Sequence, residues 1–535
     1  MKSKIKFKTI STLTLQFFLI LGFLIQCTLD LNNPKDPRSR SFFETTLWEE
    51  YLRGLCNADL RGTIRFGSGT YKIYPYQLLK LKNGNLIVTA GVFEPVTWNG
   101  NSVGKNFSYS GTQGTDVNAI IFLINGKSFQ VEWLDYLGII TVASDDRSTV
   151  PAVELSNGDI VTSAYVKSAS QGNPISSKSN ANSLHMVRYD QRGNRVWNTY
   201  LDKSDNSIVE SRFVLVTDEG NNIHFFFNGI GISMTPDTVG FGEFPSMVVP
   251  SDATNTGNQE IGWGVISQAG TPIKQRYLPS YGQTIIKDAT YVGAGTILIF
   301  GGSVDNYVGY TGHPLPSYNF QRPMVTKLSI SNFDMENTTY LGTNSTNHTL
   351  GYISEAISAS DGVYTSGVSA GDFGTSFHSF QLYSGTTSFR NAIFSKFDRN
   401  GNLIWNQFLG STISDIVEIA PKLSYVSSNN LLKAYTFSPE SGALFTGFSI
   451  PITGKGINPY QKTTLNIAGG NGYYQSIHYE TGFFNFPPTS TDLVNNVAVV
   501  KESCGGRLVR LQNTIDLNTE IGTMEVTTRP AYEEP

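Results

Sequence analysis

The chain has 535 residues, and its 39 Lys and Arg against 43 Asp and Glu give a formal net charge of −4. Charged residues make up only 15%, while Gly (52), Tyr (26) and Phe (33) are abundant and Cys (3) is scarce. This composition excludes a coiled coil, a charged disordered chain and a disulfide-dense miniprotein. Because no basic surplus can neutralise a phosphate backbone, we expect no nucleic-acid partner.

Residues 1–26 have the pattern of an export signal. Four lysines precede an uncharged apolar run, Ile10 to Ile25, which is shorter than the roughly 20 residues of a membrane-spanning helix. The run ends in LIQC and resembles a bacterial lipobox, whose cysteine, here Cys27, is diacylated and becomes the mature N-terminus. Gln26 stands where a small residue is usual, so a plain secretory signal is the alternative. The expected mature chain is acidic, with a formal charge of −8.

The segment that follows the signal is expected to lead into the folded body. Residues 27–40 are polar and carry two prolines, which is typical of a tether. Residues 41–60 contain Leu47, Tyr51 and Leu55 at helical spacing, so we predict a short helical lead-in there.

The body of the chain, residues 61–535, is a repeat. An ending of the form aromatic-Leu recurs with variable spacing, and the copies are numerous enough to define the whole fold. The clear endings are at Leu137, Leu201, Leu278, Leu341 and Leu409, with weaker ones at Leu465 and Leu517.

Each of the better copies contains four short apolar runs. In the second copy these are 151–155, 159–166, 184–190 and 195–201, and Asn157-Gly158 joins the first two as a tight hairpin. Seven such copies without helical patterns between them predict an all-β fold, a seven-bladed β-propeller of four-stranded antiparallel blades. The last two copies are degenerate, so six or eight blades remain open. The repeated tryptophans are expected to pack between sheets, namely Trp133, Trp197 and Trp405.

The repeats resemble those of bacterial seven-bladed propellers. Residues 391–410 (NAIFSKFDRNGNLIWNQFLG) have that family's strand, D-x-x-G-N turn, aromatic strand and closing Leu-Gly, and residues 182–202 and 118–138 are similar. The start of the expected mature chain, residues 27–52, resembles the opening of spirochaetal, especially leptospiral, surface lipoproteins. The resemblance implies a lipid-anchored protein of the bacterial cell envelope, in the outer membrane, and implies almost nothing about activity.

The motifs of known catalytic and metal sites are missing from the sequence. The six histidines lie in six separate segments, no two cysteines are adjacent as in quinoprotein dehydrogenases, and no G-x-S-x-G elbow is present. DRNGN (398–402) is interpreted as a hairpin turn rather than a calcium loop. We therefore expect no metal and no cofactor, and whether the chain is an enzyme stays uncertain, with a non-enzymatic role favoured.

One end of the predicted sheets is elaborated. The links between the second and third strands are long, and long loops on a rigid scaffold often carry recognition. Alternatively, their aromatic residues fold down to cover the blade edges. The candidate binding residues are Trp98, Phe107, Tyr109, Phe241, Phe244, Tyr310, Tyr318, Phe377 and Phe380.

The resulting hypothesis is a binding or scaffold module, a monomer that contacts a protein or a glycan through its long-loop face and the membrane through its lipid only. The alternative is an enzyme at the central channel, a hydrolase or lyase acting on sugars or lactones.

Two cysteines remain besides Cys27. Cys56 precedes the first copy and Cys504 lies in the last, in a chain expected to be exported, so we predict a disulfide between them. Two separate buried thiols are the alternative.

Overall fold

The chain divides into two units, and the described residues of the computed structural model all belong to the larger one, residues 60–501 with 507–535. The predicted tether and helix, Cys27, Cys56 and Cys504 lie outside the described residues. Those are 62–98, 103–140, 150–177, 182–202, 208–230, 241, 244, 247–248, 259–278, 284–303, 322–341, 351–359, 361–369, 391–409, 422–426, 431–438, 444–451, 461–466, 507–516 and 521–530.

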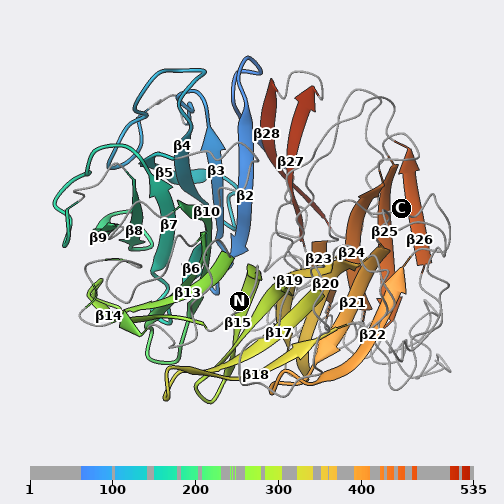
Figure 1. Ribbon diagram of the computed structural model, residues 1–535. Helices are drawn as coiled ribbons and strands as arrows, with labels where there is room; N and C mark the ends of the chain where they lie inside the picture. The colour runs from blue at the N-terminus through green and yellow to red at the C-terminus, as the bar shows by residue number, and fades with distance from the viewer. Residues whose placement is uncertain are drawn as a thin grey trace, which may run out of the picture. The chain divides into compact units, whose positions relative to one another are not determined.

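All regular structure in the described residues is β-strand, and the strands form sheets in the order of the sequence (Figure 1). The first sheet contains β2 (Ile73–Lys80), β3 (Leu86–Val92), β4 (Asn118–Ile124) and β5 (Val131–Ile139). The second contains β6 (Ala152–Glu154), β7 (Ile160–Val166), β8 (Ser183–Tyr189) and β9 (Arg195–Asp202).

The next sheets repeat this antiparallel order. The third contains β10 (Ile208–Thr217), β11 (Ile223–Ile230), β13 (Gln259–Ile266) and β14 (Pro272–Tyr277), with the short β12 (Met247–Val248) parallel to β14. The fourth contains β15 (Thr284–Gly293), β16 (Thr296–Ser303), β17 (Arg322–Ser329) and β18 (Asp334–Tyr340). The fifth contains β19 (Gly351–Ala359), β20 (Gly362–Ser369), β21 (Asn391–Phe397) and β22 (Leu403–Leu409). The sixth contains β23 (Lys422–Val426), β24 (Leu431–Ser438), β25 (Leu444–Pro451) and β26 (Gln461–Asn466).

The remaining sheet, here called the terminal sheet, combines both ends of the described chain. Its order is β1 (Gly62–Phe66), β28 (Ile521–Pro530) and β27 (Arg507–Asp516). β28 was not predicted from the sequence, because it follows the last aromatic-Leu ending. β28 pairs with β27 on one side and with β1 on the other, Gly62 lying opposite Thr528 and Phe66 opposite Met524.

The prediction of an all-β fold is confirmed for the described residues, and five of their sheets are four-stranded and antiparallel as predicted. The third sheet differs by the added parallel strand β12, and the terminal sheet has three strands. The recurring endings mark the fourth strands: Leu137 and Leu201 lie in β5 and β9, and Leu278 directly follows β14. The predicted Asn157-Gly158 hairpin is also confirmed. Gly158 has a φ of +83°, which a side chain would strain, and its N–H donates to the Leu155 carbonyl at 3.0 Å.

The hydrophobic core lies between successive sheets. One cluster joins the first and second sheets through residues such as Ile121 and Val187, and others join the second to the third, the third to the fourth and the fourth to the fifth. Phe66 and Met524 of the terminal sheet pack into the core of the first sheet. The first four sheets therefore bury both of their faces, which explains why central strands such as β4 are apolar on both sides.

Two of the repeated tryptophans fasten neighbouring sheets, as predicted. Trp133 stacks on Tyr189 at 5.3 Å, and its indole N–H donates to the Gln191 carbonyl in the next sheet. The indole N–H of Trp197, in the second sheet, likewise donates to a carbonyl of the third sheet, that of Gln268, at 2.9 Å. Among the described residues, no helix is long and apolar enough to cross a membrane.

Candidate functional site

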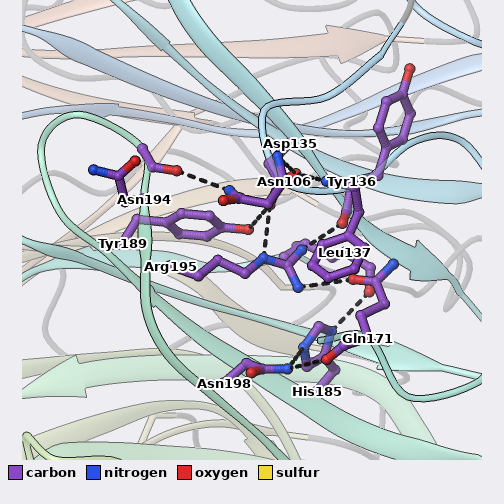
Figure 2. Close-up of polar contacts among 12 residues, drawn as sticks. Asn106, Asp135, Tyr136, Leu137, Gln171, His185, Tyr189, Asn194, Arg195 and Asn198 are labelled. Carbon is purple, nitrogen blue, oxygen red and sulfur yellow. Dashed lines mark hydrogen bonds and ion pairs between the residues drawn. The ribbon is translucent and has the colours of Figure 1, made fainter. Parts of the chain in front are cut away.

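A buried polar cluster lies where the first sheet meets the second (Figure 2). Its centre is the carboxylate of Asp135 on β5, which is fully buried. It accepts hydrogen bonds from the Tyr189 hydroxyl and from Arg195 Nε, both at 2.8 Å. It also accepts from the backbone N–H groups of Asn106 (3.0 Å) and Phe107 (2.8 Å). One carboxylate on β5 therefore bonds both to the connection between β3 and β4 and to the second sheet.

Arg195 is the cation of this cluster. Its other nitrogens donate to Gln171 Oε1 at 3.0 Å and to the Tyr136 carbonyl at 2.7 Å, and its guanidinium lies 4.2 Å from the centre of the Phe107 ring. Burial by itself lowers the pKa of Arg195, but Tyr189 and Asp135 raise it overall. Burial also raises the pKa of Tyr189 well above its usual value, so this hydroxyl remains a donor. Asp135 and Arg195 therefore form a buried ion pair.

His185 lies beside this cluster and is also bonded on both ring nitrogens. Nδ1 is 2.8 Å from the Leu137 carbonyl and must carry the proton, because a carbonyl oxygen only accepts. Nε2 then accepts from the Asn198 amide at 3.4 Å, and the ring stacks on Tyr200 with centroids 4.2 Å apart. With both nitrogens occupied and the side chain fully buried, the ring is not placed to act as a base.

A second buried histidine occupies the third sheet. The Trp263 indole N–H donates to His224 Nδ1 at 3.1 Å, so Nε2 carries the proton and donates to Asp218 at 3.2 Å. Burial raises the pKa of Asp218, but hydrogen bonds from His224 and Asn222 outweigh it and lower the pKa to about 2. The charge of Asp218 is thus used to orient a structural histidine.

In both clusters the charged and titratable groups are bonded to other parts of the chain. Arg195 and Tyr189 connect the first two sheets, and His224 connects a turn to the middle of its own sheet. Among the described residues no group of three or more His, Cys, Asp or Glu side chains could hold a metal ion. What the arrangement does chemically is to fasten sheets and connections to one another.

Three of the predicted binding aromatics lie in the connection between β3 and β4, and all three contact the protein itself. The Trp98 indole N–H donates to the Val103 carbonyl at 3.1 Å, and Phe107 stacks under Arg195. The Tyr109 hydroxyl donates to the Asp116 carbonyl at 2.6 Å; burial and the Asp116 charge raise the pKa of this tyrosine to about 12.

Two more of the predicted binding residues, Phe241 and Phe244, are buried in the core of the third sheet. The ring centroid of Phe241 lies 5.2 Å from that of Phe227, and the ring centroid of Phe244 lies 5.9 Å from that of Phe225. They offer no exposed ring to a partner, and the alternative interpretation, aromatics that cover the sheet, describes them. Tyr310, Tyr318, Phe377 and Phe380 lie outside the described residues.

The central residues of Figure 2 were not predicted from the sequence. Asp135 is a charged residue between two apolar neighbours, Leu134 and Tyr136, and this contrast is the signal that could have identified it. Nothing local to Arg195 distinguishes it from an exposed residue at the start of a strand. Only the approach of the first sheet, 60 residues earlier in the chain, makes it a buried partner.

No family model matches the chain, and no curated protein matches it. Several solved structures are similar. A polysaccharide lyase of family PL25, an ulvan lyase, is 9% identical with a TM-score of 0.40, covering 74% of this chain and 86% of that one. The WD40 domain of SCAP from fission yeast is 8% identical with a TM-score of 0.33, covering 89% and 99%. A GH43 β-xylosidase/α-arabinofuranosidase from a compost microbial metagenome is 9% identical with a TM-score of 0.28, covering 65% and 98%. Likeness at this level carries no argument about activity or partner.

Proposed function

We propose that this chain is a seven-bladed β-propeller of the bacterial cell envelope that binds a protein or a glycan and is anchored by an N-terminal lipid. The observation that carries the binding role is the separation of short and long connections. In the first sheet residues 81–85 and 125–130 are short turns, whereas residues 93–117 form a long connection between the second and third strands. The second sheet has the same arrangement, with residues 167–182 as its long connection.

Neighbouring strands are antiparallel, so the two short turns of a sheet lie at one end and the long connection lies at the other. The ends that carry long connections offer the more varied surface, held by a rigid scaffold, and recognition is usually located on such loops. A propeller presents these ends on one face. We assign partner binding to this long-connection face.

The proposed propeller is supported by the order of the sheets. The described residues form six sheets that are consecutive in sequence, together with the terminal sheet, and hydrophobic clusters are shared between successive sheets from the first to the fifth. The terminal sheet contains the first described strand and the last two, and its core is continuous with that of the first sheet. Pairing of the two chain ends within one sheet is the arrangement that closes a ring of blades.

The binding role can be tested by photo-crosslinking in intact cells. A photoreactive phenylalanine analogue replaces Gln113, exposed in the long connection of the first sheet, and in a matched variant Gln130, exposed in a short turn of the same sheet. We expect crosslinked products from position 113 and none from position 130. Equal products from both positions, or none from 113 and from a second long-connection site at Asn173, would contradict the assignment. A glycan array probed with the purified chain covers the case of a sugar ligand.

The lipid anchor is a separate part of the proposal and rests on the sequence around Cys27. Lipidated chain is expected to enter the detergent phase on phase partitioning, while Cys27→Ala leaves an unlipidated precursor that does not acquire the lipid mass. If mass spectrometry finds the same N-terminus without lipid in both proteins, the anchor is wrong. The Cys56–Cys504 disulfide stays a prediction.

A further inference from the structure

We propose that the long connections of the first three sheets also act as edge straps: residues 103–108, 171–177 and 247–248 lie along the outermost strand of their own sheet and keep that edge from pairing with a second copy of the chain. This role goes beyond partner binding, because it concerns the outer edge of each sheet rather than a recognition surface.

The first two straps bond to the same position of their fourth strands. In the first sheet the N–H of Lys105 donates to the Leu134 carbonyl at 2.6 Å. In the second sheet the N–H of Ile175 donates to the Asn198 carbonyl at 2.8 Å. Leu134 and Asn198 each lie two residues before the aromatic of the recurring aromatic-Leu ending, so these two bonds are made at equivalent positions of the repeat.

The third sheet repeats this arrangement with a short strand. β12 pairs in parallel with β14, and Met247 lies opposite Gln275, which is again two residues before the aromatic of the ending, Tyr277. The Gln275 side chain also holds the backbone of Phe241, accepting from its N–H at 3.0 Å and donating to its carbonyl at 2.8 Å. Three connections of unrelated sequence therefore reach the same register position on three successive outer strands.

The physical reason lies in the outer strands themselves. β5 and β9 are the last strands of their sheets, and β14 is followed only by β12. An outermost strand presents a row of unpaired N–H and C=O groups, which readily pairs with a strand of another molecule. A strap that bonds to some of these groups, and covers their neighbours, removes that template.

The first strap is clamped by Asp135, and its backbone fits closely. Asp135 accepts from the N–H groups of Asn106 and Phe107, and the Asn106 amide reaches the Gly193 carbonyl of the second sheet at 2.9 Å. A side chain at Gly104 would place its Cβ 2.1 Å from the Phe107 carbonyl oxygen and 3.2 Å from Asp135 Cα. Glycine is thus required for the strap to approach β5.

The second strap has different anchors. The Tyr200 hydroxyl accepts from the N–H of Gln171, and the Asn198 amide donates to the Gln171 carbonyl, both at 2.8 Å. The N–H of Tyr200 donates to the Ser176 carbonyl at 2.9 Å, so bonds run in both directions between strap and strand. The two straps are held by different anchors but bond to the same position of their outermost strands. The contact with the strand is therefore the feature that both straps share.

The test uses the full chain in a mild non-ionic detergent, with Gly104→Ala as the main variant. Hydrogen exchange followed by mass spectrometry reports the amides of residues 105–107, and sedimentation over a range of concentrations reports self-association. We expect exchange at these amides to become faster by at least about tenfold, with β4 unchanged, because only the strap opens. We also expect concentration-dependent association of the variant. Gln130→Ala, exposed in a short turn of the same sheet, is the matched control and should behave as wild type.

Asn106→Ala is the second variant. If Gly104→Ala unfolds the whole protein, which faster exchange in β4 would reveal, the result for Asn106→Ala alone is used. Asn106→Ala removes the two hydrogen bonds that the Asn106 side-chain amide donates to Asp135 and to the Gly193 carbonyl, and it introduces no steric conflict. Faster strap exchange together with self-association supports the proposal. The proposal is overturned if the strap amides already exchange freely in the wild type, if exchange is unchanged in the deciding variant, or if a released strap leaves the chain monomeric at every concentration. The proposed partner binding is tested separately, by crosslinking from position 113, and does not depend on these results.

Discussion

The junction of the first two sheets and the third sheet each contain a buried histidine and a carboxylate, but the two carboxylates have different partners. At the junction Asp135 pairs with Arg195, and His185 bonds to the Leu137 carbonyl and to the Asn198 amide. In the third sheet Asp218 bonds directly to His224, whose other nitrogen accepts from Trp263. The first carboxylate is bonded to a guanidinium group, and the second to a histidine ring whose other nitrogen accepts a hydrogen bond from an indole. The comparison teaches that one repeat architecture can hold a carboxylate in two ways, with an arginine from the next sheet or with a histidine of its own sheet.

The largest expected effect is at the junction. Arg195→Met keeps most of the length of the side chain but leaves the fully buried Asp135 charge without its cation, and breaking a buried pair in this way costs about 3–5 kcal/mol. Urea unfolding at pH 7 should show that loss in the free energy of unfolding. Arg192→Met, at an exposed position in the neighbouring turn, is the control and should change stability by less than about 0.5 kcal/mol. Equal losses in the two variants would mean that the ion pair contributes nothing.

A smaller, pH-dependent effect is expected in the third sheet. The folded pKa of Asp218 is about 2, below the ordinary value of 3.8, so its contribution is fully present above pH 4 and is lost as the pH falls toward 2. The shift corresponds to about 2 kcal/mol of stability. Asp218→Asn should therefore flatten the loss of stability between pH 4 and 2 relative to wild type, as measured by urea unfolding at each pH. Glu219→Gln, an exposed neighbour in the same turn, should leave the slope as it is; a slope that persists in Asp218→Asn sinks the assignment.

The smallest effect is expected from the indole that completes the second cluster. Trp263→Phe keeps an aromatic ring in the core but removes the only N–H group that the structure shows bonding to His224 Nδ1 among the described residues. An unsatisfied buried acceptor and the reduced packing should together lower the free energy of unfolding by about 1–2 kcal/mol at pH 7. Phe226→Leu, a change of packing in the same core cluster without a lost hydrogen bond, is the comparison. A Trp263→Phe protein as stable as wild type would show that this bond is not needed.

The sequence was informative wherever a feature depends on neighbouring residues. Hairpin turns such as Asn157-Gly158, the apolar strand runs and the recurring endings at Leu137 and Leu201 are local, because turn chemistry and the two-residue period of a strand act over a few positions. The candidate site was much less predictable. The aromatic residues of the long connections could be recognised, but not whether they faced a partner or the protein, since both arrangements are compatible with the same loop sequence.

By itself, the sequence determined the class of the fold, the recurrence of its unit and the division of the first five sheets into short turns and one long connection. The tertiary structure alone decided that β28 joins β1, that Asp135 meets Arg195 and that Phe241 is buried. Each of these depends on segments that are far apart in the chain and are brought together only when successive sheets pack. A buried charge or an open strand edge is costly without a partner, and the partner comes from a segment that packing brings close. No single stretch of sequence therefore identifies that partner.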